Sequence, residues 1–333
     1  MLQGRQSWAF PSRPAVIGSA AVGGPFEAKG ALAADFDILH DDMWLGQNSF
    51  ERAERTLLEE ACKKAIDKAG VKKEDVQFFF SGDLMNQIIS SSFAARTLGM
   101  PFFGLFGACS SSMESLALAS QIVDTKFADN ALAAACSHNA SVEKQFRYPT
   151  EYGAQKPPTA QWTVTGAGAA VIAQEGEGPR VTGATIGRVV DMGLSDPYNM
   201  GSAMAPAAVD TIEAHIRDFN RDLNYYDVIA TGDLGSVGHK IAADLLQEHG
   251  INVPAERFTD CGMMLYKKEQ NVRAGASGCA CSAVVAYGHF LKRMRKGELQ
   301  KVLIIATGAL LSPLSYQQGE SIPCIAHAVA IEM

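Results

Sequence analysis

The chain has 333 residues, 47% of them hydrophobic and 20% charged, which is an ordinary globular composition with enough residues for a large core or two domains. A net charge of −7 argues against a large nucleic-acid-binding surface, and no apolar run approaches the roughly 18 residues of a membrane span. Seven cysteines without framework spacing, and an N-terminus without signal-peptide features, predict a soluble cytoplasmic protein with reduced thiols.

The first hundred residues alternate patterns typical of strands and helices, which predicts an α/β protein. Apolar side chains recur at helical spacing up to Gly70, a C-cap signal, and a second helical pattern stops at Gly99 and Pro101. We therefore expect helices over residues 47–69 and 84–98 and strands over residues 15–22, 76–81 and 102–106.

A small-residue segment follows the last of these strands and contains Gly107, Ala108, Cys109 and Ser110. A helical pattern then covers residues 113–123, so Cys109 is expected at a strand-to-helix junction. Unpaired N–H groups and the helix dipole favour an anion there, which predicts a lowered thiol pKa and a better nucleophile. The alternative is a buried cysteine that acts only as a small apolar side chain.

The rest of the chain repeats the alternation of strands and helices. Residues 130–136 form an apolar strand pattern, residues 138–161 a long irregular segment, and residues 165–174 and 180–191 two further strands. Helices are expected over residues 203–223 and 238–248, and again after the small-residue turn at 275–281. Strands are expected over residues 227–230, 302–307 and 325–331. This succession predicts two similar halves, residues 1–175 and 176–333, related by an internal duplication.

These patterns resemble the thiolase-like superfamily, especially its type III ketoacyl synthase branch. The residues that carry the resemblance are 107–110, 165–171, 227–230 and 275–278, and they span nearly the whole chain. The resemblance implies two similar βα halves in a five-layered αβαβα arrangement, usually assembled as a homodimer through an edge strand. We expect the apolar strand at residues 131–136 to be that edge.

The chain departs from this superfamily at two positions where a condensing enzyme needs side-chain chemistry. Gly232 falls where a histidine is expected, and Ala276 falls where the enolate-binding asparagine is expected. Neither side chain can transfer a proton or bind an oxyanion, so we expect a chain without catalytic residues. The alternative is an acyltransferase or condensing enzyme that uses Cys109 with His138 or His239.

Within the superfamily, the segment 79–87 and the opening residues 4–8 most resemble a family of sporulation proteins. The resemblance implies binding of dipicolinate (pyridine-2,6-dicarboxylate), alone or as its Ca²⁺ chelate, during uptake into the bacterial spore and release from it. It also implies membrane-embedded transport proteins as partners and a peripheral position at the spore inner membrane. No cofactor and no resident metal ion are expected, because Cys279 and Cys281 lack further ligands nearby.

A ligand of this kind needs donors for its carboxylates and an apolar slot for its ring. Hydroxyls and cations at predicted turns are the candidates, although each also has a structural interpretation. Asp83 is also suited to cap the following helix, the serines to cap turns locally, and His138 to serve as a satisfied structural histidine. The candidate ligand-binding residues are Cys109, His138, Asn86, Asp83, Ser110, Ser277 and Arg147.

Overall fold

The computed structural model describes residues 1–147 and 155–333. Its main sheet contains two sets of strands in the same order, β3-β9-β7-β5-β6 and β10-β15-β14-β11-β12. In both sets the first two pairings are antiparallel and the last two are parallel. The sets meet through the pairing of Arg180 with Ala15. This repeated order is the pattern that an internal duplication produces, while the division at residue 175 stays a prediction.

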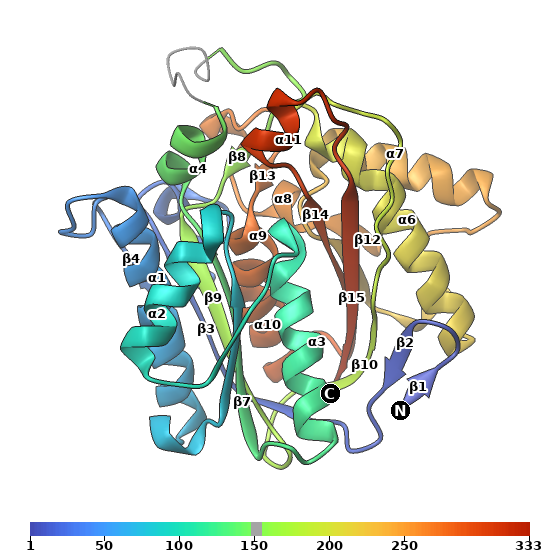
Figure 1. The fold of residues 1–333 in the computed structure, drawn as a ribbon. Coiled ribbons are helices and arrows are strands. Elements are labelled where there is room, and N and C mark those ends of the chain that lie inside the picture. Colours follow the sequence, from blue (N-terminus) through green and yellow to red (C-terminus); the bar gives the residue numbers. More distant parts are fainter. Residues whose placement is uncertain (148–154) are drawn as a thin grey trace.

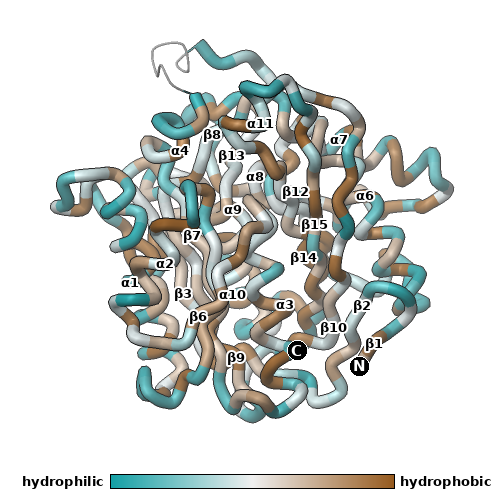
Figure 2. The backbone as a smooth tube through the Cα atoms, viewed as in Figure 1, coloured by the Kyte–Doolittle hydropathy of each residue, from teal (hydrophilic) through white to brown (hydrophobic). Residues whose placement is uncertain are grey.

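The strands coincide with the apolar runs of the sequence, because both faces of each sheet are covered. Hydrophobic residues follow the strands, and hydrophilic residues gather in peripheral loops and helix ends (Figure 2). The strands are β1 (Leu2–Gln3), β2 (Ser7–Ala9), β3 (Ala15–Gly23), β4 (Ile38–Leu39), β5 (Phe78–Gly82), β6 (Phe102–Gly104), β7 (Asn130–Ser137), β8 (Trp162–Thr163), β9 (Gly166–Ala173), β10 (Arg180–Thr185), β11 (Val228–Thr231), β12 (Phe258–Asp260), β13 (Ala276–Ser277), β14 (Lys301–Ala309) and β15 (Cys324–Glu332).

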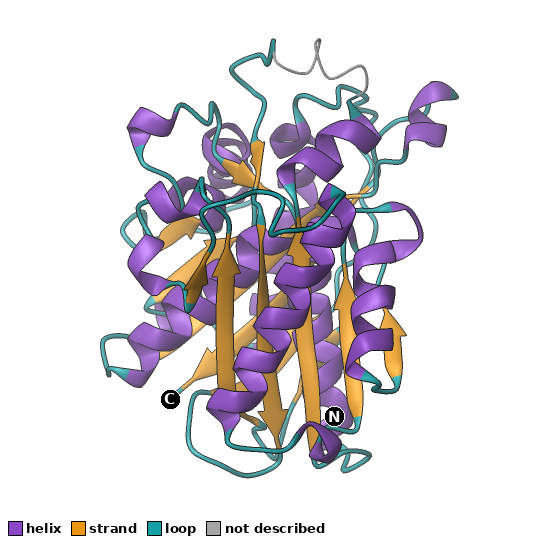
Figure 3. Cartoon of the chain, turned by 90° about the vertical axis from the view of Figure 1, so that its left-hand side faces the viewer, coloured by secondary structure: helices purple, strands orange, loops and turns teal. Residues whose placement is uncertain are grey.

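The helices form three layers around the strands, so that the molecule has the expected five-layered αβαβα arrangement (Figure 1). One outer layer packs on β3 and β9, the middle layer brings α3 against α9, and the other outer layer packs on β14 and β15. Figure 3 shows helices lying along the strands of the sheet. The helices are α1 (Phe50–Ala69), α2 (Ile89–Leu98), α3 (Ser111–Asp124), α4 (Asn139–Phe146), α6 (Met200–Phe219), α7 (Gly235–Glu248), α8 (Cys261–Met264), α9 (Cys279–Val284), α10 (Leu291–Arg295) and α11 (Pro313–Gln317).

Two expected elements differ from the structure near the candidate site. The helix predicted over residues 84–98 begins only at Ile89, because Asp83 accepts hydrogen bonds from the N–H groups of Met85 and Ser91 and holds a turn before it. The segment expected to be irregular, 138–161, contains α4, whose N-cap is His138. Residues 148–154 of that segment lie outside the described part.

The expected edge strand is a central strand. Residues 131–136 belong to β7, which pairs with β5 on one side and β9 on the other, and they are fully buried. The apolar character of this strand reflects burial on both faces rather than an interface. The edge of this set of strands is β6, which pairs with β5.

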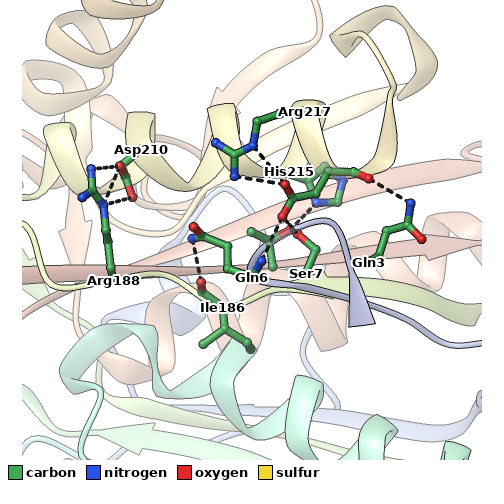
Figure 4. Close-up of polar contacts among 10 residues, drawn as sticks. Gln3, Gln6, Ser7, Ile186, Arg188, Asp210, His215 and Arg217 are labelled. Atoms are coloured by element: carbon green, nitrogen blue, oxygen red, sulfur yellow. Dashed lines mark hydrogen bonds and ion pairs between the residues drawn. The ribbon is translucent and has the colours of Figure 1, made fainter. Parts of the chain in front are cut away.

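The N-terminal hairpin of β1 and β2 is fastened to the second half of the chain (Figure 4). The Gln6 N–H and the Ser7 hydroxyl donate to Asp218 Oδ2 at 3.1 and 2.9 Å, and the Gln6 side chain donates to the Ile186 carbonyl at 2.8 Å. Asp218 lies in α6, so these contacts tie the start of the chain to an outer helix.

Candidate ligand-binding site

A cavity of about 680 Å³ is lined by residues from both halves of the chain. Some of these residues belong to α4 and α11, two helices that lie at the same end of the molecule (Figure 1). Most of its wall is apolar, with side chains such as Phe106, Met200 and Leu314. A small number of polar groups converges on it, as in ligand-binding cavities generally. These polar lining residues are Asp83, Asn86, Gln87, Cys109, Gln145, Arg147, Gln161, Thr163, Asp233, Ser277 and Ser312.

Cys109 lies at the expected junction, in a short turn that leads into α3. Ala108 has a positive φ of 49°, which is unusual for a residue with a side chain and marks a tightly constrained backbone. The Ser110 hydroxyl donates to the Gly107 carbonyl at 2.6 Å, and the Ser111 hydroxyl donates to the Ala108 carbonyl at 2.7 Å. Both serines therefore stabilise the turn itself.

The Asp233 carboxyl lies beside the Cys109 thiol. The Thr307 hydroxyl donates to Asp233 Oδ1 at 2.7 Å, and the Gly278 N–H donates to Asp233 Oδ2 at 3.0 Å. Burial raises the pKa of Asp233 to about 7, against the effect of these two hydrogen bonds. The carboxyl can therefore carry a proton near neutral pH.

The prediction of a lowered thiol pKa at Cys109 is wrong. Burial raises the pKa of Cys109 well above its ordinary value, and the neighbouring Asp233 carboxylate raises it further. The residue is only 8% exposed, so loss of hydration outweighs the attraction of a helix N-terminus. The sulfur is in the thiol form at neutral pH.

Asp260 holds the loop that carries Asp233. One of its carboxylate oxygens accepts from the Thr231 hydroxyl at 2.7 Å and the Leu234 N–H at 2.8 Å, and the other accepts from the Gly235 N–H at 3.0 Å. Asp260 is fully buried at the end of β12. The position of Asp233 therefore depends on a buried carboxylate of the neighbouring strand.

Alkylation of Cys109 by iodoacetamide is expected to be slow at pH 7–8, because the raised pKa leaves little thiolate. The rate should keep rising as the pH passes the ordinary thiol pKa of about 8.5 instead of levelling off there. Intact mass spectrometry of the folded chain measures this, with the urea-unfolded chain as the reactive control. Rapid formation of a single adduct on Cys109 at neutral pH would contradict the assigned environment.

The model of the stage V sporulation protein AD (SpoVAD) family matches residues 4–332. Stage V sporulation protein AD of Bacillus subtilis strain 168 is 50% identical over 331 residues, which cover 99% of this chain and 98% of that protein. The chain belongs to the SpoVAD family. It has the fold of the thiolase-like synthases, because solved structures of such synthases are similar to this chain at low sequence identity.

Two of these solved structures have TM-scores of 0.62. The 3-oxoacyl-(acyl-carrier-protein) synthase III of Aquifex aeolicus is 12% identical, with 96% of this chain and 100% of that chain covered. Cerulenin-bound OleA of Xanthomonas campestris is 13% identical, with 96% of each chain covered. At these identities, the structural similarity establishes the fold of this SpoVAD-family chain. Its chemistry has to be inferred from its own residues.

Five of the seven predicted site residues of the SpoVAD-family chain line the cavity, namely Cys109, Asp83, Asn86, Ser277 and Arg147. Both interpretations of Asp83 apply. It lines the cavity, and it also accepts hydrogen bonds from the Met85 N–H before α2 and the Ser91 N–H within α2. Whether these residues contact a ligand stays a prediction.

Ser110 and His138 are not among the cavity-lining residues. The Ser110 hydroxyl donates within the short turn that leads into α3. His138 is fully buried; its Nε2 is 2.9 Å from the Met43 carbonyl, and its Nδ1 accepts from the Ala140 N–H at 3.2 Å. It is a satisfied structural histidine, and its position directly after a strand reflects helix capping rather than ligand contact.

Arg147 brings positive charge to the cavity wall. Its Nη1 donates to Glu143 Oε1 at 2.6 Å, and the Lys156 ammonium donates to the same oxygen at 2.6 Å. Two cations thus share one carboxylate, which leaves a local excess of one positive charge. The Arg147 side chain is only 6% exposed, and its Nε has no hydrogen-bond partner among the described residues.

Gln161 has no role predicted from the sequence, and Asp233 is predicted from the sequence as a carboxylate that disfavours an enolate or joins a Ca²⁺ ion bound with the ligand. The Gln161 side chain donates to the Asp233 carbonyl at 2.6 Å and to the Ala276 carbonyl at 3.1 Å, so it joins two loops of the site. No motif or periodicity marks this residue. For Asp233, the available signal is an acidic residue in the loop after a predicted strand.

Proposed function

We propose that this SpoVAD-family chain binds dipicolinate, free or as its Ca²⁺ chelate, in the cavity beside Cys109, and that it does so without catalysis. Binding would support the movement of dipicolinate into the spore during sporulation and out of it during germination. The observation that carries the proposal is a buried guanidinium, Arg147, on the wall of a largely apolar cavity.

The shape of the site supports a flat aromatic dicarboxylate. Apolar side chains such as Phe106, Phe146 and Met204 offer a surface for the ring, and Arg147 offers a charge-assisted partner for one carboxylate. Asn86 and Ser277 add polar groups along the wall. A volume of about 680 Å³ leaves room for bound water or a metal ion beside the ligand.

The charges of the site bear on the form in which dipicolinate binds. Burial raises the pKa of Asp83 to about 6 and that of Asp233 to about 7. A free dianion requires these two acids to keep their protons, because like charges at close range repel. A Ca²⁺ chelate instead allows either carboxylate to ionise and to join the oxygen ligands that Ca²⁺ prefers.

The surroundings of Cys109 argue against condensing chemistry. A side chain at Gly232 would collide with the backbone of Ala306 and Thr307, so no imidazole fits at that position. His239 stacks on Phe258 and lines a different cavity. With His138 committed to structural hydrogen bonds, neither histidine considered as a partner of the thiol is positioned for proton transfer.

The wider assembly is also part of the proposal. Strand β6 is an edge, and Phe103 within it and Phe106 after it are 48% and 62% exposed. We propose that this edge pairs with a second copy in a homodimer. Membrane-embedded transport proteins of the same system are the proposed partners, at the spore inner membrane. In the described residues, no helix is long and apolar enough to cross a membrane.

Calorimetric titration with dipicolinate, in the presence of Ca²⁺ and separately of a Ca²⁺ chelator, tests the proposal. We expect saturable binding in at least one of the two conditions, and the comparison identifies the bound species. Benzene-1,3-dicarboxylate is the matched control ligand, because it keeps both carboxylates but lacks the chelating ring nitrogen. Absence of heat at millimolar dipicolinate in both conditions would refute the proposal, and an acyl adduct on Cys109 after incubation with acyl-CoA would favour a condensing enzyme instead.

A further inference from the structure

Three buried side chains meet behind the cavity, each from a different element of the first half. They are Glu54 of α1, Asp83 after β5 and Cys136 of β7, and one ligand atom from each lies within 4.8 Å of the other two. The Cys136 sulfur is 3.8 Å from Glu54 Oε1. Two ligands of a tetrahedral zinc ion, at about 2.3 Å for sulfur and 2.0 Å for oxygen, are roughly 3.5 Å apart. Small side-chain adjustments therefore suffice for all three to reach one ion.

Unpartnered polar atoms at this cluster indicate a missing ligand. Glu54 is fully buried, and its Oε2 has no hydrogen-bond partner among the described residues. Ser141, also fully buried, lies beside this carboxylate, and its hydroxyl likewise lacks a partner within the described ranges. A buried carboxylate oxygen without a hydrogen-bond partner is costly, and a bound cation removes that cost.

Asp83 is held in place for such a role and connects the cluster to the cavity. Its two oxygens accept from the Met85 N–H at 2.8 Å and the Ser91 N–H at 2.7 Å, which fixes the carboxylate and leaves further lone pairs free. Because Asp83 also lines the cavity, an ion can reach the cluster from that side.

We propose that Glu54, Asp83 and Cys136 form a Zn²⁺ site, with water or the Ser141 hydroxyl in the fourth position. A thiolate ligand selects a thiophilic ion over Ca²⁺, which prefers oxygen ligands only. On binding, the Cys136 thiol and the Glu54 carboxyl lose their protons to solvent, and the sulfur and the carboxylate oxygens donate electron pairs to the metal. The ion would join α1, β5 and β7 behind the cavity wall. The sequence predicted no resident metal ion and so did not indicate this role.

The test uses the full chain after treatment with a chelator and without dipicolinate, so that its outcome is independent of the proposed function. Zn²⁺ is titrated in competition with a chromophoric chelator, and Co²⁺ is added separately to detect thiolate-to-cobalt absorption. We expect one Zn²⁺ per chain and this absorption in the wild type. Both should be lost in Cys136→Ala and kept in Cys324→Ala, a matched change at a buried cysteine of β15.

Thermal unfolding with and without Zn²⁺ shows whether each variant is folded and whether the ion stabilises it. A ligand that binds the native state raises the unfolding temperature, so Zn²⁺ should stabilise the wild type and Cys324→Ala but neither Cys136→Ala nor Glu54→Gln. No Zn²⁺ bound by the wild type, or unchanged cobalt absorption and stabilisation in Cys136→Ala, would overturn the proposal.

Discussion

Replacing Arg147 by glutamine is expected to weaken dipicolinate binding by about 10- to 100-fold, the range for loss of a charge-assisted hydrogen bond. Arg147 is the cation among the described residues that line the cavity, so its removal leaves a ligand carboxylate facing Asp83 and Asp233 without compensation. Calorimetric titration of the variant beside the wild type measures the change.

Lys144→Gln is the matched control for Arg147→Gln. Lys144 lies in α4, the helix that ends directly before Arg147, but it pairs with Glu51 at 2.8 Å, is 63% exposed and does not line the cavity. Its replacement should leave the dissociation constant within about two-fold, because an exposed ion pair contributes little. Equal affinity of Arg147→Gln and wild type would show that the carboxylates bind elsewhere.

Asp260→Ala is expected to lower the free energy of unfolding by about 2 to 4 kcal/mol, because it leaves two buried N–H groups without acceptors and the Thr231 hydroxyl with only the Thr259 carbonyl at 3.3 Å. Removal of the carboxyl group also removes the cost of burying it, which offsets part of this loss of stability. Burial raises the pKa of Asp260 to about 6, which reflects that cost. Urea unfolding at neutral pH measures the difference. Ligand binding should weaken as well, because the loop carrying Asp233 loses its support.

Asp244→Ala provides the comparison for Asp260→Ala. Asp244 is an exposed residue of α7, and removal of its side chain should change stability by no more than about 0.5 kcal/mol. If Asp260→Ala is as stable as Asp244→Ala, the hydrogen bonds from Thr231, Leu234 and Gly235 do not stabilise the loop as described.

Much of the fold could be predicted from periodicity and stop signals. The helix predicted over residues 47–69 spans residues 50–69: it ends at Gly70 in a left-handed conformation, as the pattern indicated, but it starts three residues later, after Ser49 as its N-cap. The short strands β1 and β12 and the short helices α8 and α11 carry too few residues for a periodic signal. The role of residues 131–136 could not be predicted from their apolar character, because a central strand and a paired edge both bury such residues.

The candidate site could be predicted less completely, because burial and hydrogen-bond partners are properties of the folded chain. Small residues around Cys109 correctly indicated the turn between a strand and a helix. They did not indicate that burial would raise the pKa of the Cys109 thiol. His138 has the same position after a strand whether it caps a helix or faces a ligand. Asp233 is held beside the thiol by the Thr307 hydroxyl, a contact between residues 74 positions apart in the sequence.

We expect the cavity beside Cys109 to hold dipicolinate through Arg147 and to do so without covalent chemistry. The most direct measurement is a crystal structure of the full chain with dipicolinate and Ca²⁺. We expect the ligand in this cavity, with a carboxylate on the Arg147 guanidinium and the Cys109 sulfur unmodified. Dipicolinate bound only at another place, or an empty cavity in crystals saturated with ligand, would contradict the claim.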